Sequence, residues 1–262
     1  MTARFLYIAL IVLLNLSIVH GQVSITDTSE LPKYSYLIYG YSSSGNAVQA
    51  TGFFVSKKER TYLVTACHVI NGWLFESFND KGSYPDTLYV KIGLKNSGLD
   101  TVLTIDISKL KYTKADRFSH DIYFIPINIP SNCVVNSLES LISNFSPIDK
   151  IPQMIFAYGF IADDQNLSSR QFKELAPKAG KARLPDWNAY ACSPLVYEIA
   201  YSGNDLGAGY SGAPVYFITS SFGRNRSSVR LHFGGLLFGG NTAKHRAMVV
   251  RPELVKVLYD EL

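Results

Sequence analysis

The six residues "GYSGAP", Gly209 to Pro214, set a serine among glycines directly before an apolar, β-type run. A serine hydroxyl is a weak nucleophile unless a base takes its proton, and the oxyanion that then forms needs backbone N–H donors. Gly209 can adopt backbone angles closed to other residues, which lets its N–H and that of Ser211 point the same way. Gly212 leaves space beside the hydroxyl. Taken alone, the motif also fits an ordinary glycine-rich turn, so the remaining sequence has to decide.

His68 is the candidate base for this serine. The segment "TYLVTACHVI" (61–70) places His68 at the end of an apolar run, directly after small residues. The other histidines lack such a setting: His20, His120, His232 and His245. By itself, a histidine at a strand end is better explained as a buried core residue with a hydrogen bond, so His68 needs a partner carboxylate before a catalytic role is indicated.

Asp121 is the candidate carboxylate. The segment "SHDIYFIPI" (119–127) places it immediately before an apolar strand. A carboxylate in such a site fixes the tautomer of the histidine and stabilises the imidazolium. Asp121 could also simply cap a turn, and Asp106 and Asp116 are rival candidates, although neither is followed by as continuous an apolar run.

The joint arrangement favours chemistry over three separate structural explanations. His68, Asp121 and Ser211 come in that order, and each lies beside a predicted strand. Unrelated origins for all three would require three coincidences. We therefore expect one nucleophilic site assembled from distant parts of the chain.

The composition is that of a folded, strand-rich protein. The chain has 262 residues, of which 47% are hydrophobic and 18% charged, which supplies material for a core and argues against disorder. The 17 Tyr and 15 Phe favour strands over helices. The formal charge of +4 comes without a dense basic run, so we expect no nucleic-acid partner.

The N-terminal residues have the pattern of a secretory signal peptide. Arg4 precedes an apolar stretch from Phe5 to Val19, and Gly21 is small enough for a cleavage site. The alternative, an uncleaved membrane anchor, needs about 20 apolar residues, which is more than this stretch offers. We predict a signal peptide over 1–21, a secreted or periplasmic mature chain, and no membrane association after its removal.

Short apolar runs separated by turn residues predict an all-β fold of about ten strands, in the barrel or sandwich class. The predicted strands lie within 33–40, 50–56, 61–66, 86–94, 101–107, 121–127, 153–160, 195–201, 214–218 and 231–240. Helical spacing is confined to a short piece in 136–145 and to the C-terminal segment 251–262. A polar stretch from 162 to 188 is expected to be a surface excursion.

These segments resemble the trypsin/chymotrypsin-like serine peptidases over most of the mature chain. The residues that carry the resemblance are "TGFFVS" (51–56), "LVTACHVI" (63–70), "DIYFIPI" (121–127), "GYSGAP" (209–214) and "GGLLFGG" (234–240). The resemblance implies two six-stranded antiparallel Greek-key β-barrels, with the active site in the cleft between them and a short closing helix at the C-terminus. We place the N-terminal barrel in 22–135 and the C-terminal barrel with its helix in 136–262.

The resemblance also implies a role for each site residue. His68 would be the general base and then the general acid, Asp121 would orient it, and Ser211 would be the nucleophile. The N–H groups of Gly209 and Ser211 would form the oxyanion hole. Substrate-binding residues would be Asp205, Phe238, Gly239 and Gly240, the last three in the strand that pairs with extended substrate.

The substrate preference has two alternatives. Asp205 lies six residues before Ser211, where trypsin-like members carry the acid that binds Lys or Arg side chains, and equal spacing can also be accidental. His232 would instead favour an acidic side chain, as in glutamyl-specific relatives.

Three departures bring the chain closer to disulfide-poor bacterial-type members. Tyr210 stands where animal digestive members have the aspartate that receives a new N-terminus on zymogen cleavage, so we expect competence once the signal peptide is removed. Cys67 precedes His68, whereas those members have a disulfide-bonded cysteine after the histidine. Phe238 replaces their usual serine. Of the cysteines, Cys133 and Cys192 could form a disulfide, and the sequence leaves this open.

The resulting hypothesis is a serine endopeptidase that acts on protein or peptide substrates without cofactor or metal. The alternative is a catalytically silent binding module on the same scaffold. An esterase with the same three residues is a third reading, but the α/β-hydrolases that dominate that activity have the order Ser, acid, His and many helices. The oligomeric state is not indicated.

Overall fold

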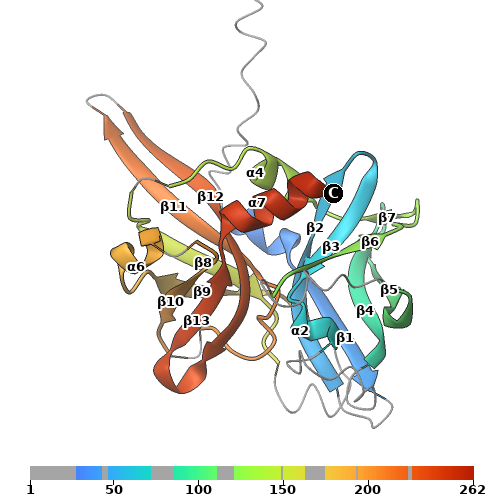
Figure 1. Cartoon of the computed structure of the whole chain (residues 1–262). Helices are drawn as coiled ribbons and strands as arrows, with labels where there is room; N and C mark the ends of the chain where they lie inside the picture. Colours follow the sequence, from blue (N-terminus) through green and yellow to red (C-terminus); the bar gives the residue numbers. More distant parts are fainter. Residues whose placement is uncertain are drawn as a thin grey trace, which may run out of the picture.

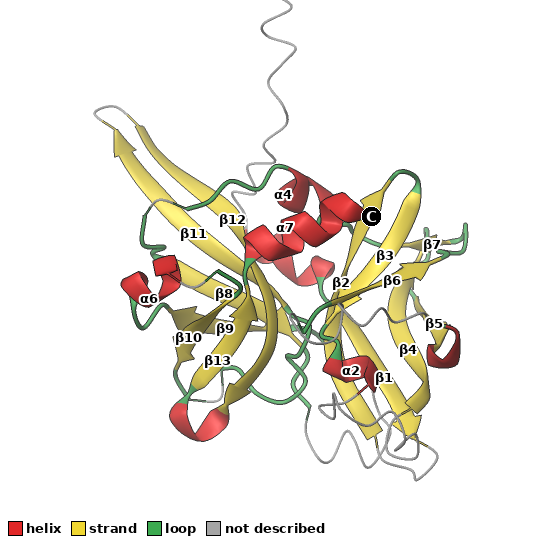
Figure 2. Cartoon of the chain, in the orientation of Figure 1, coloured by secondary structure: helices red, strands yellow, loops and turns green. Residues whose placement is uncertain are grey.

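A computed structural model describes residues 28–42, 47–71, 85–110, 121–148, 150–162, 175–192, 194–203, 205–223 and 226–262. The predicted signal peptide over 1–21 lies outside these ranges. Figure 1 shows two β units side by side, the first in blue to green and the second in yellow to red. Figure 2 shows that strands dominate both units, with the C-terminal helix α7 (Pro252–Glu261) in front of the region where they meet.

The first unit is a curved antiparallel sheet. Its strands run in the spatial order β5-β4-β1-β2-β3-β6, and a short β7 pairs with β4. The bounds are β1 (Tyr36–Ser42), β2 (Ala47–Lys57), β3 (Arg60–Thr65), β4 (Pro85–Leu94), β5 (Asp100–Asp106), β6 (Tyr123–Ile127) and β7 (Cys133–Val134). The central strand β2 is buried from Gln49 to Val55, on both of its faces, which explains why its residues are mostly apolar.

The second unit is a closed antiparallel barrel in the order β10-β13-β12-β11-β8-β9. Its strands are β8 (Met154–Gly159), β9 (Lys178–Arg183), β10 (Val196–Tyr201), β11 (Pro214–Gly223), β12 (Arg226–Asn241) and β13 (Arg246–Val250). The β11–β12 hairpin extends well beyond the barrel (Figure 1). Two β units and a C-terminal helix confirm the predicted fold class; the second unit is a closed barrel and the first is a half-open one.

One hydrophobic cluster spans the two units, and the closed barrel has a second cluster of its own. Phe53 on β2 and Phe233 on β12 lie with ring centroids 5.7 Å apart, edge to face. Helix α7 adds Val255 and Tyr259 to the same cluster, and the Tyr259 hydroxyl donates to the carbonyl of Ser56 at 2.9 Å. Strand β2 belongs to the first unit and also packs against the second, so its residues can link the two.

The remaining helices are short: η1 (Thr28–Tyr34), α2 (His68–Asn71), η3 (Ile107–Lys109), α4 (Glu139–Ser143), α6 (Trp187–Cys192) and η4 (Thr242–Lys244). Within the described ranges, no helix has the length and apolar character needed to cross a membrane. The buried thiol of Cys133 is free, which excludes the Cys133–Cys192 disulfide that the sequence left open.

Candidate functional site

His68 is positioned by a tight turn at the end of β3. After β3 ends at Thr65, the N–H of Val69 donates to the carbonyl of Ala66 at 3.1 Å, which closes the turn that begins α2. Ala66 and Cys67 are fully buried and anchor this turn in the core. The small residues noted in the sequence therefore seat the His68 backbone, while its ring faces the junction of the two units.

Asp121 holds His68 through both carboxylate oxygens. It lies two residues before β6, and β6 pairs with β3 so that Tyr123 is opposite Thr65. The backbone N–H of His68 donates to Asp121 Oδ1 at 2.9 Å, and His68 Nδ1 lies 2.6 Å from Oδ2. The two side chains are only 10% and 6% exposed, so little water competes for these bonds.

Ser211 completes the cluster from the other unit. It lies in the loop between β10 and β11, and its Oγ is 3.0 Å from His68 Nε2. Because the carboxylate accepts from Nδ1, that nitrogen carries the proton and leaves Nε2 to accept from the serine hydroxyl. The structure thus brings the three predicted residues into one hydrogen-bonded chain.

The glycines around Ser211 are required by close backbone contacts. Gly209 has φ +91°, and a Cβ there would lie 2.1 Å from the carbonyl oxygen of Phe160. Gly212 has φ +89°, and a Cβ there would lie 2.0 Å from the carbonyl oxygen of Thr51. Within the described part of the chain, the N–H groups of Gly209 and Ser211 have no protein acceptor. Two such donors beside a nucleophile can receive an oxyanion.

Within the described residues, the edge of β12 beside Ser211 has no strand partner beyond Leu237, whose carbonyl and N–H still bond to Gly212 and Ala213. β12 pairs with β11 only as far as Leu236, opposite Pro214, whereas its pairing with β13 continues through Gly239 and Gly240. The register shifts between Leu237 and Gly239, which leaves Phe238 as an extra residue. The carbonyl of Phe238 lies 3.5 Å from Ser211 Oγ.

Asp205 lies in the same loop as Ser211 and is partly buried. Its N–H donates to the carbonyl of Ser202 at 3.2 Å, and its carboxylate contributes, after burial, to the raised pKa of Tyr210. Its contact with a substrate side chain stays a prediction.

The rival candidates have other structural roles. Asp106 caps η3 by accepting from the N–H of Ser108, and it forms an ion pair with Lys109 at 2.8 Å. His232 lies on the β11–β12 hairpin, with Nε2 2.8 Å from the hydroxyl of Thr219. His245 ends η4 in the left-handed region, against the ring of Tyr201. Asp116, His20 and His120 fall outside the described residues.

Thr51 is the residue of this site that the sequence interpretation missed. It was quoted within "TGFFVS" as part of a strand, yet its N–H donates to the carbonyl of Ser211 at 2.9 Å and its hydroxyl donates to that of Gly209 at 2.7 Å. The only available signal was a polar residue inside an otherwise apolar run. Such a residue, when buried, needs hydrogen-bond partners.

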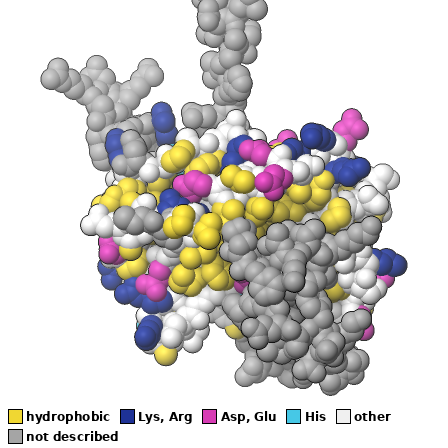
Figure 3. Space-filling view, in the orientation of Figure 1, with side chains coloured by type: hydrophobic (Ala, Val, Ile, Leu, Met, Phe, Trp, Pro, Cys, Tyr) yellow, Lys and Arg dark blue, Asp and Glu magenta, His cyan; other side chains and the backbone are white. Residues whose placement is uncertain are grey.

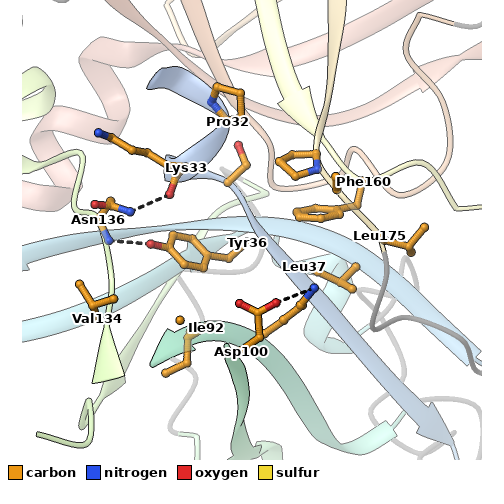
Figure 4. Close-up of a pocket in the computed structure, with 15 residues that line it drawn as sticks. Pro32, Lys33, Tyr36, Leu37, Ile92, Asp100, Val134, Asn136, Phe160 and Leu175 are labelled. Carbon is orange, nitrogen blue, oxygen red and sulfur yellow. Dashed lines mark hydrogen bonds and ion pairs between the residues drawn. The ribbon is translucent and has the colours of Figure 1, made fainter. Parts of the chain in front are cut away.

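A separate pocket of ≈ 400 Å³ lies on the first unit, between β1, β4 and the segment around Phe160 (Figure 4). None of the predicted site residues lines it. Its charged rim residues are paired, Lys91 with Asp100 at 2.8 Å and Lys33 with Glu30.

Figure 3 shows hydrophobic atoms across the middle of one face of the molecule, with charged side chains of both signs around them. Within the described ranges, no group of three or more His, Cys, Asp or Glu side chains could hold a metal ion.

Comparison with solved structures identifies the fold. The protease Anisep from Arthrobacter nicotinovorans is similar with a TM-score of 0.51 and 16% identity, covering 84% of this chain and 90% of that one. The thermostable serine protease AL20 from an extremophilic microorganism gives 0.50 and 14%, covering 87% and 97%. A protein named GrC gives 0.50 and 14%, covering 90% and 96%.

No protein-family model matches the sequence, and neither does any curated protein. The comparison with known proteins therefore rests on similarity to solved structures. The chain has the trypsin/chymotrypsin-like serine protease fold, which confirms the resemblance seen in the sequence.

Proposed function

We propose that this chain is a serine endopeptidase that hydrolyses peptide bonds through an acyl-enzyme. The single observation that carries the proposal is the continuous chain from Asp121 Oδ2 to His68 Nδ1, at 2.6 Å, and from His68 Nε2 to Ser211 Oγ, at 3.0 Å. The fold supports it, because solved structures of that fold include proteases.

In the proposed reaction, His68 Nε2 takes the proton of Ser211 as Oγ attacks the scissile carbonyl carbon. Asp121 holds the imidazole in place and stabilises its positive charge. The N–H groups of Gly209 and Ser211 stabilise the oxyanion. His68 then gives its proton to the leaving amine, the C–N bond breaks, and the acyl group stays on Ser211 until a water, activated by His68, releases it as a carboxylate.

The substrate in this proposal is a protein or peptide bound in extended form. The unpaired edge of β12 at Gly239 and Gly240 would pair with substrate backbone by β-augmentation. We further propose that residues 1–21 direct export and are removed, leaving a secreted or periplasmic enzyme. Mass analysis of the exported chain tests this part, because a retained N-terminus would contradict it.

A fluorophosphonate probe on the mature chain tests the nucleophile directly, since the probe phosphonylates an activated serine. We expect stoichiometric labelling of the wild type and none of Ser211→Ala. Labelling of the variant would exclude Ser211. A wild type that stays unlabelled, and leaves casein and peptide libraries uncut while binding a partner, would establish the silent binding module instead.

A further inference from the structure

The peptide unit between Ala208 and Gly209 is held in one orientation by a neighbouring segment. The N–H of Ala162 donates to the carbonyl of Ala208 at 2.8 Å. In a trans peptide the C=O and the next N–H point in opposite directions. The bond to Ala162 therefore turns the Gly209 N–H away from residues 160–162, and this N–H has no acceptor within the described ranges.

Residues 160–162 are in turn held by two polar side chains of β2. Thr51 Oγ1 accepts from the N–H of Phe160 at 3.0 Å, and Gln49 Nε2 donates to the carbonyl of Ile161 at 2.9 Å. Thr51 is 0% and Gln49 8% exposed. Water competes little for hydrogen bonds at such buried side chains, and losing one leaves its partners unpaired.

Thr51 also contacts the loop that carries Ser211 (205–213, the serine loop) directly. Its hydroxyl donates to the carbonyl of Gly209 at 2.7 Å, and its N–H donates to that of Ser211 at 2.9 Å. One residue of the first unit therefore holds both residues that supply the N–H pair in the second unit. Its own carbonyl accepts from the hydroxyl of Thr65 at 2.8 Å, which fixes it to β3.

From these contacts we infer that Thr51 is a positioning residue, assisted by Gln49, whose hydroxyl keeps the oxyanion-binding N–H groups of Gly209 and Ser211 in register with the His68–Ser211 pair. The inference rests on the proposed function. In this inference the interface between the units does more than pack. Strand β2 supplies no reacting group, but it sets the geometry of the loop that binds the developing negative charge.

Thr51→Val tests the inference because valine keeps the shape and removes the hydroxyl. With the fluorophosphonate at varied concentration, we expect the maximal labelling rate to fall about tenfold while the concentration for half-maximal rate stays unchanged. That loss is smaller than the roughly 10²- to 10³-fold expected when an oxyanion donor itself is removed. Thr51→Ser keeps the hydroxyl and should label within about twofold of wild type.

Ser35→Ala is the matched control. The Ser35 hydroxyl is also buried, and it also joins the first unit to a carbonyl of the second, that of Tyr158, at 2.8 Å. Within the described ranges, its hydroxyl makes no hydrogen bond to the serine loop. We expect this variant to lower the urea midpoint by an amount comparable to Thr51→Val, yet to label at the wild-type rate.

The outcomes separate the two proposals. A wild type that does not label overturns the proposed function, and the positioning role with it. A wild type that labels, together with Thr51→Val at the same rate, overturns the positioning role alone. Equal slowing in Thr51→Val and Ser35→Ala, or slow labelling by Thr51→Ser, also overturns it, because the cause would then be general packing.

Discussion

The hydroxyl of Tyr210 donates a hydrogen bond to the carbonyl of Lys178 at 2.9 Å, which ties the residue before Ser211 to the first residue of β9. The Tyr210 ring is fully buried and lies against Gly159, the residue that pairs with Lys178 across β8 and β9. The serine loop is therefore attached to the barrel by an uncharged hydrogen bond and by packing of the Tyr210 ring. That this position functions without an ion pair to a new N-terminus stays a prediction.

Tyr210→Phe is predicted to destabilise the chain by about 1 kcal/mol and to slow labelling of Ser211. The variant removes one hydroxyl and its bond to a backbone carbonyl, at little cost in apolar packing. Tyr259→Phe is the matched control, since the Tyr259 hydroxyl makes a bond of equal length, 2.9 Å, to the carbonyl of Ser56. Urea unfolding should give similar losses for both, whereas the labelling rate should fall only for Tyr210→Phe. Slowing of both would contradict a specific role.

The same phenol predicts a loss of stability in alkali. Burial, together with the Asp205 carboxylate, raises the pKa of Tyr210 from 10.0 to about 12. Below pH 10 the phenol is protonated in both the folded and the unfolded chain. Between about pH 10 and 12 the unfolded chain loses this proton first, so the free energy of unfolding falls as pH rises. Urea midpoints at pH 9 to 12 should fall less in Tyr210→Phe than in wild type; equal falls would exclude this contribution.

Gly159→Ala is predicted to disturb the serine loop through Tyr210. A Cβ at Gly159 would lie 2.5 Å from Cδ1 of the Tyr210 ring, so the ring has to shift. Overpacking of this kind costs about 1–3 kcal/mol. Gly207→Ala is the control in the same region, because a Cβ at Gly207 meets nothing within 4 Å. Labelling rate and urea midpoint should both drop for Gly159→Ala only, and a neutral result would show that the ring can move freely.

The sequence predicted the elements of the site because each carries a local signal. His68 follows an apolar strand and small residues, Asp121 leads into another strand, and Ser211 lies among glycines. What the sequence lacked was the contact between elements. Thr51 is an ordinary residue in a strand pattern, and its bonds to Gly209 and Ser211 arise only when the two units pack together.

The missed strand β9 has a comparable cause. Lys178, Lys181 and Arg183 face solvent, and the buried position between them is Gly180, where a Cβ would lie 2.1 Å from Leu206 Cδ2. A strand whose inward residue is a glycine shows no apolar alternation, so 162–188 resembled a polar excursion. The strand forms because β8 and β10 supply the pairing on both sides.

Asp121→Asn is predicted to lower the rate of Ser211 labelling by about 10⁴-fold. An amide can donate to His68 Nδ1, which would leave the ring proton on Nε2. A protonated Nε2 can no longer accept the proton of Ser211. Asp106→Asn is the control, because the Asp106 carboxylate caps η3 by accepting from Ser108. Both variants should fold by circular dichroism, and only the first should lose labelling. Retention of wild-type rate in Asp121→Asn would remove Asp121 from the mechanism.

Asp205→Asn is predicted to reduce cleavage after Arg or Lys by about 10- to 100-fold while leaving cleavage after uncharged residues unchanged. A carboxylate near the bound side chain would make a charge-assisted hydrogen bond to guanidinium or ammonium, and the amide removes its charge at nearly constant shape. Asp186→Asn is the control: Asp186 directly precedes α6, and its replacement changes the net charge equally but should not alter the preference. The measurement is kcat/KM on a peptide series that varies only the residue before the cut. An unchanged Arg-to-Ala ratio in Asp205→Asn would show that its spacing from Ser211 is accidental, and the preference would then have to come from another residue of the loop or of β12.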